Sequence, residues 1–122
     1  MSYFRDRIKE TLTGGAPGTG NVTLNGTGAT GGYNPFSTIP LNTYFKYVIV
    51  DNTNSLWETG RGYLTTTTNL IRDTPEDGSS GLATLVNFTS GTLDVFLSAT
   101  AKTIEQIGAG HYYVAVRNWN LP

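Results

Sequence analysis

Short stretches of alternating apolar and polar residues, separated by turn-forming residues, most constrain how this 122-residue chain can fold. The clearest stretch runs from position 93 to position 97, and the residues on one of its faces are all apolar: Leu93, Val95 and Leu97. Its other face carries Asp94 and Phe96, and Ser90-Gly91 supplies a turn in front of it. A period of two residues is typical of a half-buried β-strand, so this stretch predicts a β-module.

Two neighbouring stretches predict a hairpin in the middle of the chain. Thr43 to Val50 is β-branched and aromatic throughout. It predicts a strand that is covered on both faces, because neither face is clearly polar. Asp51 to Ser55 forms a turn, and Leu56 to Leu64 pairs back as the second strand. Gly60 and Gly62 share one face of that strand, which indicates a β-bulge or the close approach of another backbone, such as that of a neighbouring subunit.

Weaker signals complete the predicted fold. Four more stretches have the composition of strands: Thr19 to Asn25, Asn69 to Asp73, Leu82 to Phe88 and His111 to Trp119. Phe36 to Leu41 has prolines beside and within it and predicts an edge or a connection, whereas Pro75 to Gly81 predicts an exposed loop. The whole pattern predicts an all-β fold, an antiparallel β-sandwich or squashed barrel of about seven or eight strands. Helix is expected only in the first dozen residues or from Thr100 to Ile107.

The chain divides into an N-terminal arm, residues 1–12, and a single β-domain, residues 13–122. The arm carries the densest charge in the sequence, with Phe4 and Ile8 as apolar positions. An extended arm or edge strand is favoured over a short helix, which a Ser2 cap would support. Two roles stay open. The arm docks on a partner through Phe4, Arg5, Arg7 and Ile8, or it is an ordinary edge strand of the chain's own sheet.

Composition excludes several classes of function. The formal net charge is −1 and no Lys/Arg cluster occurs, so no nucleic-acid partner is expected. The absence of cysteine excludes disulfides, thiolate metal sites and a thiol nucleophile. No apolar stretch approaches the length of a membrane span, so no membrane partner is expected. Only 14% of residues are charged, and a neutral, hydrogen-bonding surface of this kind suits packing against other protein subunits.

No catalytic, cofactor or metal site is expected. The single histidine, His111, lies in an alternating stretch without a positioned partner, which favours a structural role. Gly26 to Gly31 formally matches a dinucleotide fingerprint, but Gly32-Tyr33-Asn34-Pro35 follows where a helix must begin. Asp51 to Ser55 and Asp73 to Gly78 are faintly similar to calcium loops, and turn-forming side chains account for both more simply.

Five stretches in order resemble one known domain: Asp6 to Thr11, Gly18 to Leu24, Trp57 to Gly62, Leu85 to Phe88 and Gly91 to Phe96. The chain resembles a small β-domain of tailed-bacteriophage virion proteins, found in short structural proteins and at the start of tail-fibre-like chains. The resemblance covers Phe4 to Leu97. It implies a virion structural protein, made in the host cytoplasm and located in the phage particle. It favours a capsid decoration (cement) protein, with a tail-fibre adaptor or other tail structural protein as the alternative.

The implied partners are further copies of the chain, most simply a homotrimer, and the major capsid protein or tail proteins of the same particle. The strand pattern indicates candidate contact residues in the hairpin: Tyr44, Lys46, Val48, Gly60 and Gly62. A carbohydrate-binding module is a further alternative, with Trp57, Tyr63, Tyr112 and Trp119 as stacking platforms, although aromatic residues of β-sandwiches more often lie in the core.

Overall fold

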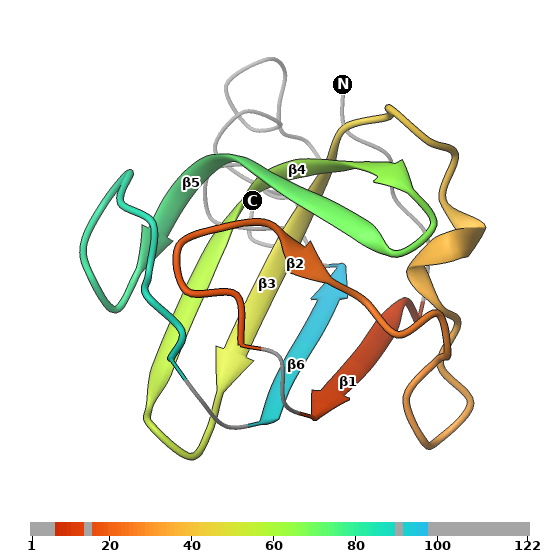
Figure 1. Cartoon of the computed structure of the whole chain (residues 1–122), viewed down its shortest axis with the longest axis horizontal. Coiled ribbons are helices and arrows are strands. Elements are labelled where there is room, and N and C mark those ends of the chain that lie inside the picture. The colour runs from red at the N-terminus through yellow and green to blue at the C-terminus, as the bar shows by residue number, and fades with distance from the viewer. Residues whose placement is uncertain (1–6, 14–15, 90–91, 98–122) are drawn as a thin grey trace, which may run out of the picture.

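The computed structural model describes residues 7–13, 16–89 and 92–97, which form one curled antiparallel sheet (Figure 1). Its strands are β1 (Lys9–Thr13), β2 (Val22–Thr23), β3 (Phe45–Asp51), β4 (Leu56–Thr66), β5 (Asn69–Gly78) and β6 (Thr92–Leu97). Their order across the sheet is β1-β6-β3-β4-β5-β2. The predicted all-β, antiparallel fold is confirmed. A sandwich and a count of seven or eight strands are not confirmed, because the described residues contain six strands in a single sheet.

The sheet curls into a half-barrel because its two longest strands bend. The pairing of β4 with β5 shifts register at three places, between Thr59 and Gly60, between Arg61 and Tyr63, and between Leu64 and Thr66. Such irregularities bend a strand and increase its twist. The bend brings β2, which pairs with the start of β5, in front of β3 and β6 (Figure 1). The concave side of the sheet therefore encloses the core.

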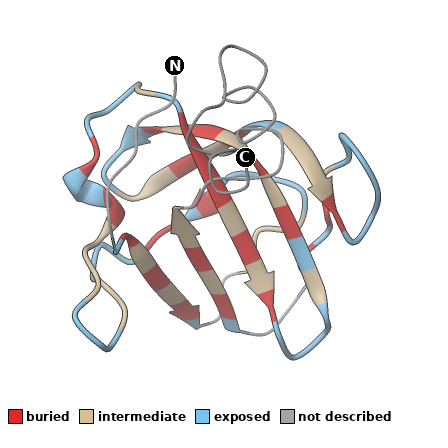
Figure 2. Cartoon of the chain, turned by 180° about the vertical axis from the view of Figure 1, so that it is seen from behind, coloured by how far each residue is buried: buried red, intermediate tan, exposed pale blue. Residues whose placement is uncertain are grey.

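Alternation along the strands separates this core from the outside, as the stripes of buried residues in Figure 2 show. The buried apolar residues from the strands are Leu12, Val22, Phe45, Tyr47, Ile49, Leu64, Leu70, Leu93 and Val95. A short 3₁₀ helix, η1 (Phe36–Thr38), adds Phe36, whose ring centroid lies 5.6 Å from that of Phe45. Leu93 and Val95 are buried whereas Asp94 and Phe96 are not, so the alternation predicted for this strand is confirmed.

The predicted hairpin is also confirmed. β3 pairs with β4 in continuous register from Phe45 opposite Gly62 to Asp51 opposite Leu56. The buried Asp51 carboxylate closes the turn by accepting hydrogen bonds from the backbone N–H of Thr53 (3.0 Å) and of Asn54 (3.2 Å). This is an Asx turn, the side-chain chemistry expected from the sequence in place of a calcium loop.

One prediction of local structure is wrong, and two others hold only in part. Leu82 to Phe88 is not a strand but a turn and an irregular segment with one isolated bridge, between Gly18 and Phe88. Pro75 to Gly81 is not wholly a loop, because β5 continues to Gly78. A register shift next to Pro75 allows the strand to pass a residue without an N–H donor. The strand predicted over Thr19 to Asn25 is only two residues long.

β1 forms one edge of the sheet and pairs with β6, so the chain is extended from Lys9 to Thr13. Ile8 and Leu12 are 2% and 5% exposed and belong to the core. Phe4 and Arg5, the Ser90-Gly91 turn, the possible helix from Thr100 to Ile107 and the stretch from His111 to Trp119 lie outside the described residues. No helix in the part of the chain that the structure describes is long and apolar enough to cross a membrane.

Candidate functional site

The convex side of the sheet, opposite the core, carries three of the predicted contact residues. We call it the outer face and define it by the residues that share it across β6, β3 and β4: Asp94, Phe96, Tyr44, Lys46, Val48, Val50, Trp57, Thr59, Arg61 and Tyr63. The even-numbered residues of β3 lie here because the odd-numbered ones point into the core. The structure therefore brings Tyr44, Lys46 and Val48 together on one face.

An apolar strip runs along the outer face. Val48 lies opposite Phe96 of β6, and Val50 lies opposite Trp57 of β4. Val48, Val50 and Phe96 are half-buried, and Trp57 is 39% exposed. These four residues, which we call the apolar strip, are adjacent because cross-strand neighbours on one face have their Cβ atoms about 5 Å apart.

A charged aromatic cluster lies beside the strip. The guanidinium of Arg61 lies 4.0 Å from the centre of the Tyr44 ring and donates a 2.8 Å hydrogen bond to Asp73. The Tyr63 ring packs edge-on against Tyr44 at 5.6 Å. The hydrogen bond between Arg61 and Asp73 raises the pKa of the arginine, and the same bond, followed by one from Thr74, lowers the pKa of Asp73. Both side chains are partly exposed, so water screens this pair.

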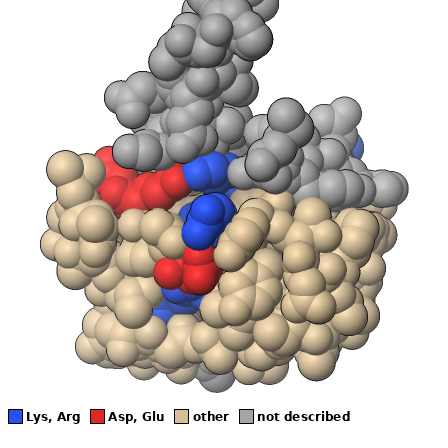
Figure 3. Space-filling view, turned by 90° about the horizontal axis from the view of Figure 1, so that it is seen from above, with Lys and Arg blue, Asp and Glu red and all other residues tan. Residues whose placement is uncertain are grey.

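Lys46 is less available than its position suggests. It is 3% exposed, and its ammonium is already paired with the carboxylate of Glu76 on β5. Figure 3 shows basic and acidic side chains next to one another on one face of the molecule. Lys46 therefore holds β3 to β5 in this structure.

Gly60 and Gly62 do not lie on the surface. Both are buried on the concave side of β4 against the Tyr47 ring. A Cβ atom at Gly60 would lie 2.6 Å from the carbonyl oxygen of Thr74, and one at Gly62 would lie 2.4 Å from that of Ile71. The close backbone approach that the two glycines predicted is therefore made by β5 of the same chain, at the bulges, and not by a neighbouring subunit.

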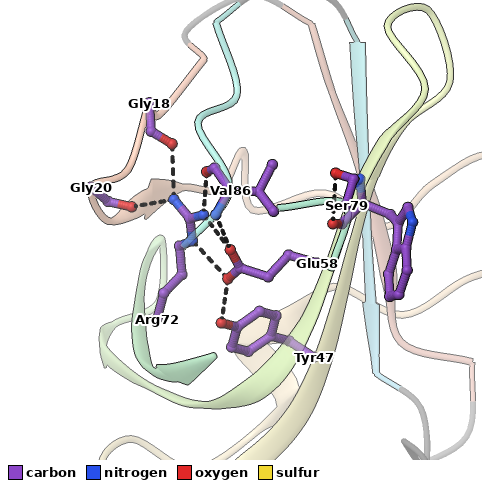
Figure 4. A network of polar contacts seen from close by, with 8 residues as sticks. Gly18, Gly20, Tyr47, Glu58, Arg72, Ser79 and Val86 are labelled. Atoms are coloured by element: carbon purple, nitrogen blue, oxygen red, sulfur yellow. Dashed lines mark hydrogen bonds and ion pairs between the residues drawn. The ribbon is translucent and has the colours of Figure 1, made fainter. Parts of the chain in front are cut away.

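A buried polar network fills the middle of the concave side (Figure 4). The Glu58 carboxylate accepts hydrogen bonds from Arg72 Nη2 (2.6 Å) and Nε (3.0 Å) and from the Tyr47 hydroxyl (2.6 Å). Glu58 is 0% exposed and Arg72 is 6% exposed. These hydrogen bonds, two of them from one guanidinium, replace the hydrogen bonds that the carboxylate would make with water.

The same network fixes two segments that lie outside the strands. Arg72 donates from Nη1 to the carbonyl oxygens of Gly18 and Gly20, both at 3.0 Å, and from Nη2 to that of Val86 at 2.7 Å. The Val86 N–H returns a 2.7 Å hydrogen bond to Glu58. These bonds replace the strand pairing that the sequence predicted around Val86, since they satisfy both of its backbone groups. The network is structural, because each of its charged groups is fully engaged within the protein.

Tyr47 serves this network as a permanent donor. Burial raises the pKa of its hydroxyl far above the ordinary value of 10.0, and the hydrogen bond to Glu58 raises it further. A tyrosine that keeps its proton throughout the physiological range holds a carboxylate in place, but it is not a general base.

Glu10 organises the opposite end of the concave side. Its carboxylate is 0% exposed and accepts three backbone hydrogen bonds, from Asn25 (2.9 Å), Gly26 (3.0 Å) and Phe36 (2.9 Å). The Gly26 to Gly31 segment is thereby tied to β1 as a loop. Among the described residues that follow it, the nearest helix is the three-residue 3₁₀ helix η1, whereas the dinucleotide fingerprint requires a helix that begins at the glycine-rich segment.

An open pocket of about 310 Å³ lies at the N-terminal end of β1. We call it the basic pocket, and its lining is Arg7, Ile8, Lys9, Tyr33, Phe96 and Leu97. The Arg7 guanidinium lies 4.3 Å and the Lys9 ammonium 5.1 Å from the centre of the Tyr33 ring. Two of the predicted contact residues of the arm, Arg7 and Ile8, therefore meet here.

Sequence reasoning did not single out Glu58, Arg72 and Tyr33, and it counted Lys9 and Glu10 only among the charges of the N-terminal arm. Glu10, Glu58 and Arg72 had a usable signal, because each is a charged residue with an apolar or glycine neighbour two positions away. These neighbours are Ile8 and Leu12 for Glu10, Leu56 and Gly60 for Glu58, and Leu70 for Arg72. A charge on a face that is otherwise buried indicates a paired or hydrogen-bonded group. No comparable signal brings Tyr33 to β1, since they are separated by an irregular loop.

Residues 7–13, 16–89 and 92–97 contain no group of three or more His, Asp or Glu side chains close enough to hold a metal ion. His111 lies outside these residues. Comparison of the chain with protein-family models, with curated proteins and with solved structures found no match.

Proposed function

We propose that this chain is a bacteriophage virion structural protein, and most specifically a capsid decoration (cement) protein that assembles as a homotrimer on the particle and stabilises it. The apolar strip carries the proposal. Val48, Val50, Phe96 and Trp57 place a continuous apolar surface on a rigid sheet, on the side away from the core. Surfaces of this kind serve as protein contacts, because burying them against another subunit removes apolar area from water.

The way the edges of the sheet are hydrogen-bonded favours a subunit contact through the outer face over one through an edge strand. At β1, the backbone N–H of Lys9 donates to Asn34 (3.1 Å) and its carbonyl oxygen accepts from Ala29 (2.9 Å). The Asn25 side chain covers the carbonyl oxygen of Thr11 at 2.9 Å. Beyond its short pairing with β2, β5 carries Pro75, which has no donor, and its Glu76 carbonyl oxygen accepts from the N–H of Ala83 at 3.1 Å. Blocked edges disfavour the addition of a partner strand and leave the outer face as the more favourable contact surface.

The predicted sandwich or squashed barrel of seven or eight strands stays part of this proposal for the whole chain. The curled six-stranded sheet is compatible with it, since a half-barrel becomes a barrel or sandwich when further strands are added to its open side.

Location on the particle tests the proposal. Immunogold electron microscopy with an antibody against the purified chain should label the heads of intact phage particles. Label confined to the tail would favour the alternative of a tail-fibre adaptor or tail structural protein. Particles that carry no label anywhere would contradict the virion proposal as a whole.

The oligomeric state of the purified chain tests whether the apolar strip is the contact between subunits. Light scattering should give a mass three times the 13.2 kDa of one chain. Val50→Lys places a charge in the apolar strip and should reduce the mass to that of one chain, whereas the matched Ser80→Lys, in an exposed turn, should not. A trimer that survives Val50→Lys unchanged would exclude the strip as the subunit contact.

Carbohydrate binding is the second candidate, and the exposure of Trp57 favours it. Tyr44 supports it less, because Arg61 covers one side of its ring and Tyr63 packs against it. Trp57→Ala should abolish binding to host-cell polysaccharide if this candidate is correct. A trimer that binds no polysaccharide would reject it.

A further inference from the structure

We infer that the basic pocket binds a carboxylate carried by an acidic segment of a partner protein. The inference goes beyond the proposed function, because it depends on the groups that line the pocket and not on which particle or subunit supplies the ligand. Arg7 and Lys9 provide the charge, Tyr33 provides an aromatic wall, and Phe96 and Leu97 provide an apolar wall.

The two cations of the pocket have no ion-pair partner among the described residues, where the ion pairs are Lys46–Glu76, Arg61–Asp73 and Arg72–Glu58. Arg7 donates one hydrogen bond, from Nη2 to the carbonyl oxygen of Gly31 at 2.5 Å, and a guanidinium carries five N–H donors in all. Lys9 contacts the Tyr33 ring and has three donors. Two cations close to one ring repel each other, and a bound anion removes this repulsion.

The pocket is held open by backbone hydrogen bonds. The Asn34 N–H donates to the carbonyl oxygen of Arg7 at 2.6 Å, and the Lys9 N–H donates back to that of Asn34 at 3.1 Å. Arg7 has a φ of 57°, a left-handed conformation that a non-glycine residue adopts only when its surroundings enforce it. These contacts fix the positions from which both cations project, so a ligand does not have to order the loop that carries Tyr33.

The lining selects a peptide carboxylate over a nucleic-acid backbone. A nucleic acid requires several cations along its phosphates, whereas the described residues that line this pocket supply two, on a chain of net charge −1. Phe96 and Leu97 suit an apolar residue adjacent to a Glu or Asp.

Fluorescence anisotropy with the full chain tests the inference. The probe is a labelled peptide of alternating Glu and Leu, and its control is the same peptide with Gln in place of Glu. The Glu peptide should bind at least about tenfold more tightly, because hydrogen bonds to charged groups are the stronger ones. Lys9→Gln should weaken its binding by at least about threefold, in the range of exposed charge pairs. Ser80→Asp, which changes the net charge equally at an exposed turn, should leave binding unchanged.

Several outcomes overturn the inference. Equal binding of the two peptides would show that charge is not recognised. Equal loss in Lys9→Gln and Ser80→Asp would show a long-range effect of net charge. Tighter binding of a labelled oligothymidylate than of the Glu peptide would assign the cations to nucleic acid. A measurement on the unmodified chain keeps the test independent of folding defects: the ring resonances of Tyr33 and Phe96 should shift on addition of the Glu peptide, and unchanged resonances would reject the pocket.

Discussion

The pair Glu58–Arg72 and the pair Asp73–Arg61 join the same two chemical groups across the same two strands, β4 and β5, on opposite sides of the sheet. Glu58 and Arg72 lie on the concave side with side chains 0% and 2% exposed, and they also bind the Tyr47 hydroxyl and the backbone at Gly18, Gly20 and Val86. Asp73 and Arg61 are 29% and 39% exposed and contact Thr74 and the Tyr44 ring. From this difference in burial and in number of partners, we expect the concave pair to contribute more to the fold than the convex pair.

The concave pair should give the largest effect. Glu58→Ala leaves the Arg72 guanidinium buried without its counter-charge and should lower the free energy of unfolding by about 3–5 kcal/mol. Asp73→Ala is the matched control on the convex side and should cost less than about 1 kcal/mol. Urea denaturation of both variants measures the difference. Equal losses would contradict the distinction between the two sides of the sheet.

Glu10 extends the comparison, because it is buried and none of the ion pairs among the described residues includes it. Glu10→Ala leaves the N–H groups of Asn25, Gly26 and Phe36 without their acceptor and should cost up to about 3 kcal/mol, since an unsatisfied buried donor loses its hydrogen bond to water as well. Hydrogen exchange should show faster exchange at the Phe36 amide, with the β3–β4 hairpin amides unchanged. Unchanged exchange at Phe36 would show that the carboxylate is not its acceptor in solution.

Tyr47 provides a prediction that depends on pH. Its pKa is raised in the folded chain, so the folded state retains a proton that the unfolded state releases above pH 10.0. The stability from this group is complete below pH 10.0 and should fall by about 1.4 kcal/mol per pH unit above it. Tyr47→Phe should cost about 1.5 kcal/mol near neutral pH. It should also reduce the slope of stability against pH above 10.0. An unchanged slope would show that Tyr47 does not titrate on unfolding.

The convex pair should give the smallest effect. Hydrogen bonds from Arg61 and Thr74 lower the pKa of Asp73, so its contribution is present above pH 3.8 and is lost as the pH falls through the lowered value. Because both partners are partly exposed, Asp73→Asn should change the free energy of unfolding by less than about 1 kcal/mol, and salt should reduce the change further. A loss of unfolding free energy as large as that of Glu58→Ala would show that the convex and concave pairs stabilise the fold equally.

Local pattern by itself predicted the all-β class, the β3–β4 hairpin, the Asx turn at Asp51 and the strand that ends at Leu97. In each of these the information lies within a few residues, since side chains alternate along a strand and short polar side chains close turns. The even positions of β3 could likewise be placed on one face from the sequence, which brought Tyr44 and Val48 to the outer face.

Tertiary structure alone decided the conformation around Val86, the surroundings of Gly60 and the formation of the basic pocket, because each depends on residues distant in sequence. The segment around Val86 has the composition of a strand, but Arg72 and Glu58 satisfy its backbone and remove the need for a neighbouring strand. Gly60 could face a subunit or its own chain, and the curl of the sheet placed it against Tyr47 and β5. The basic pocket required a loop contact that brings Tyr33 to Arg7 and Lys9, across more than twenty residues. No periodicity records such contacts, since they arise only when the sheet closes over its own core.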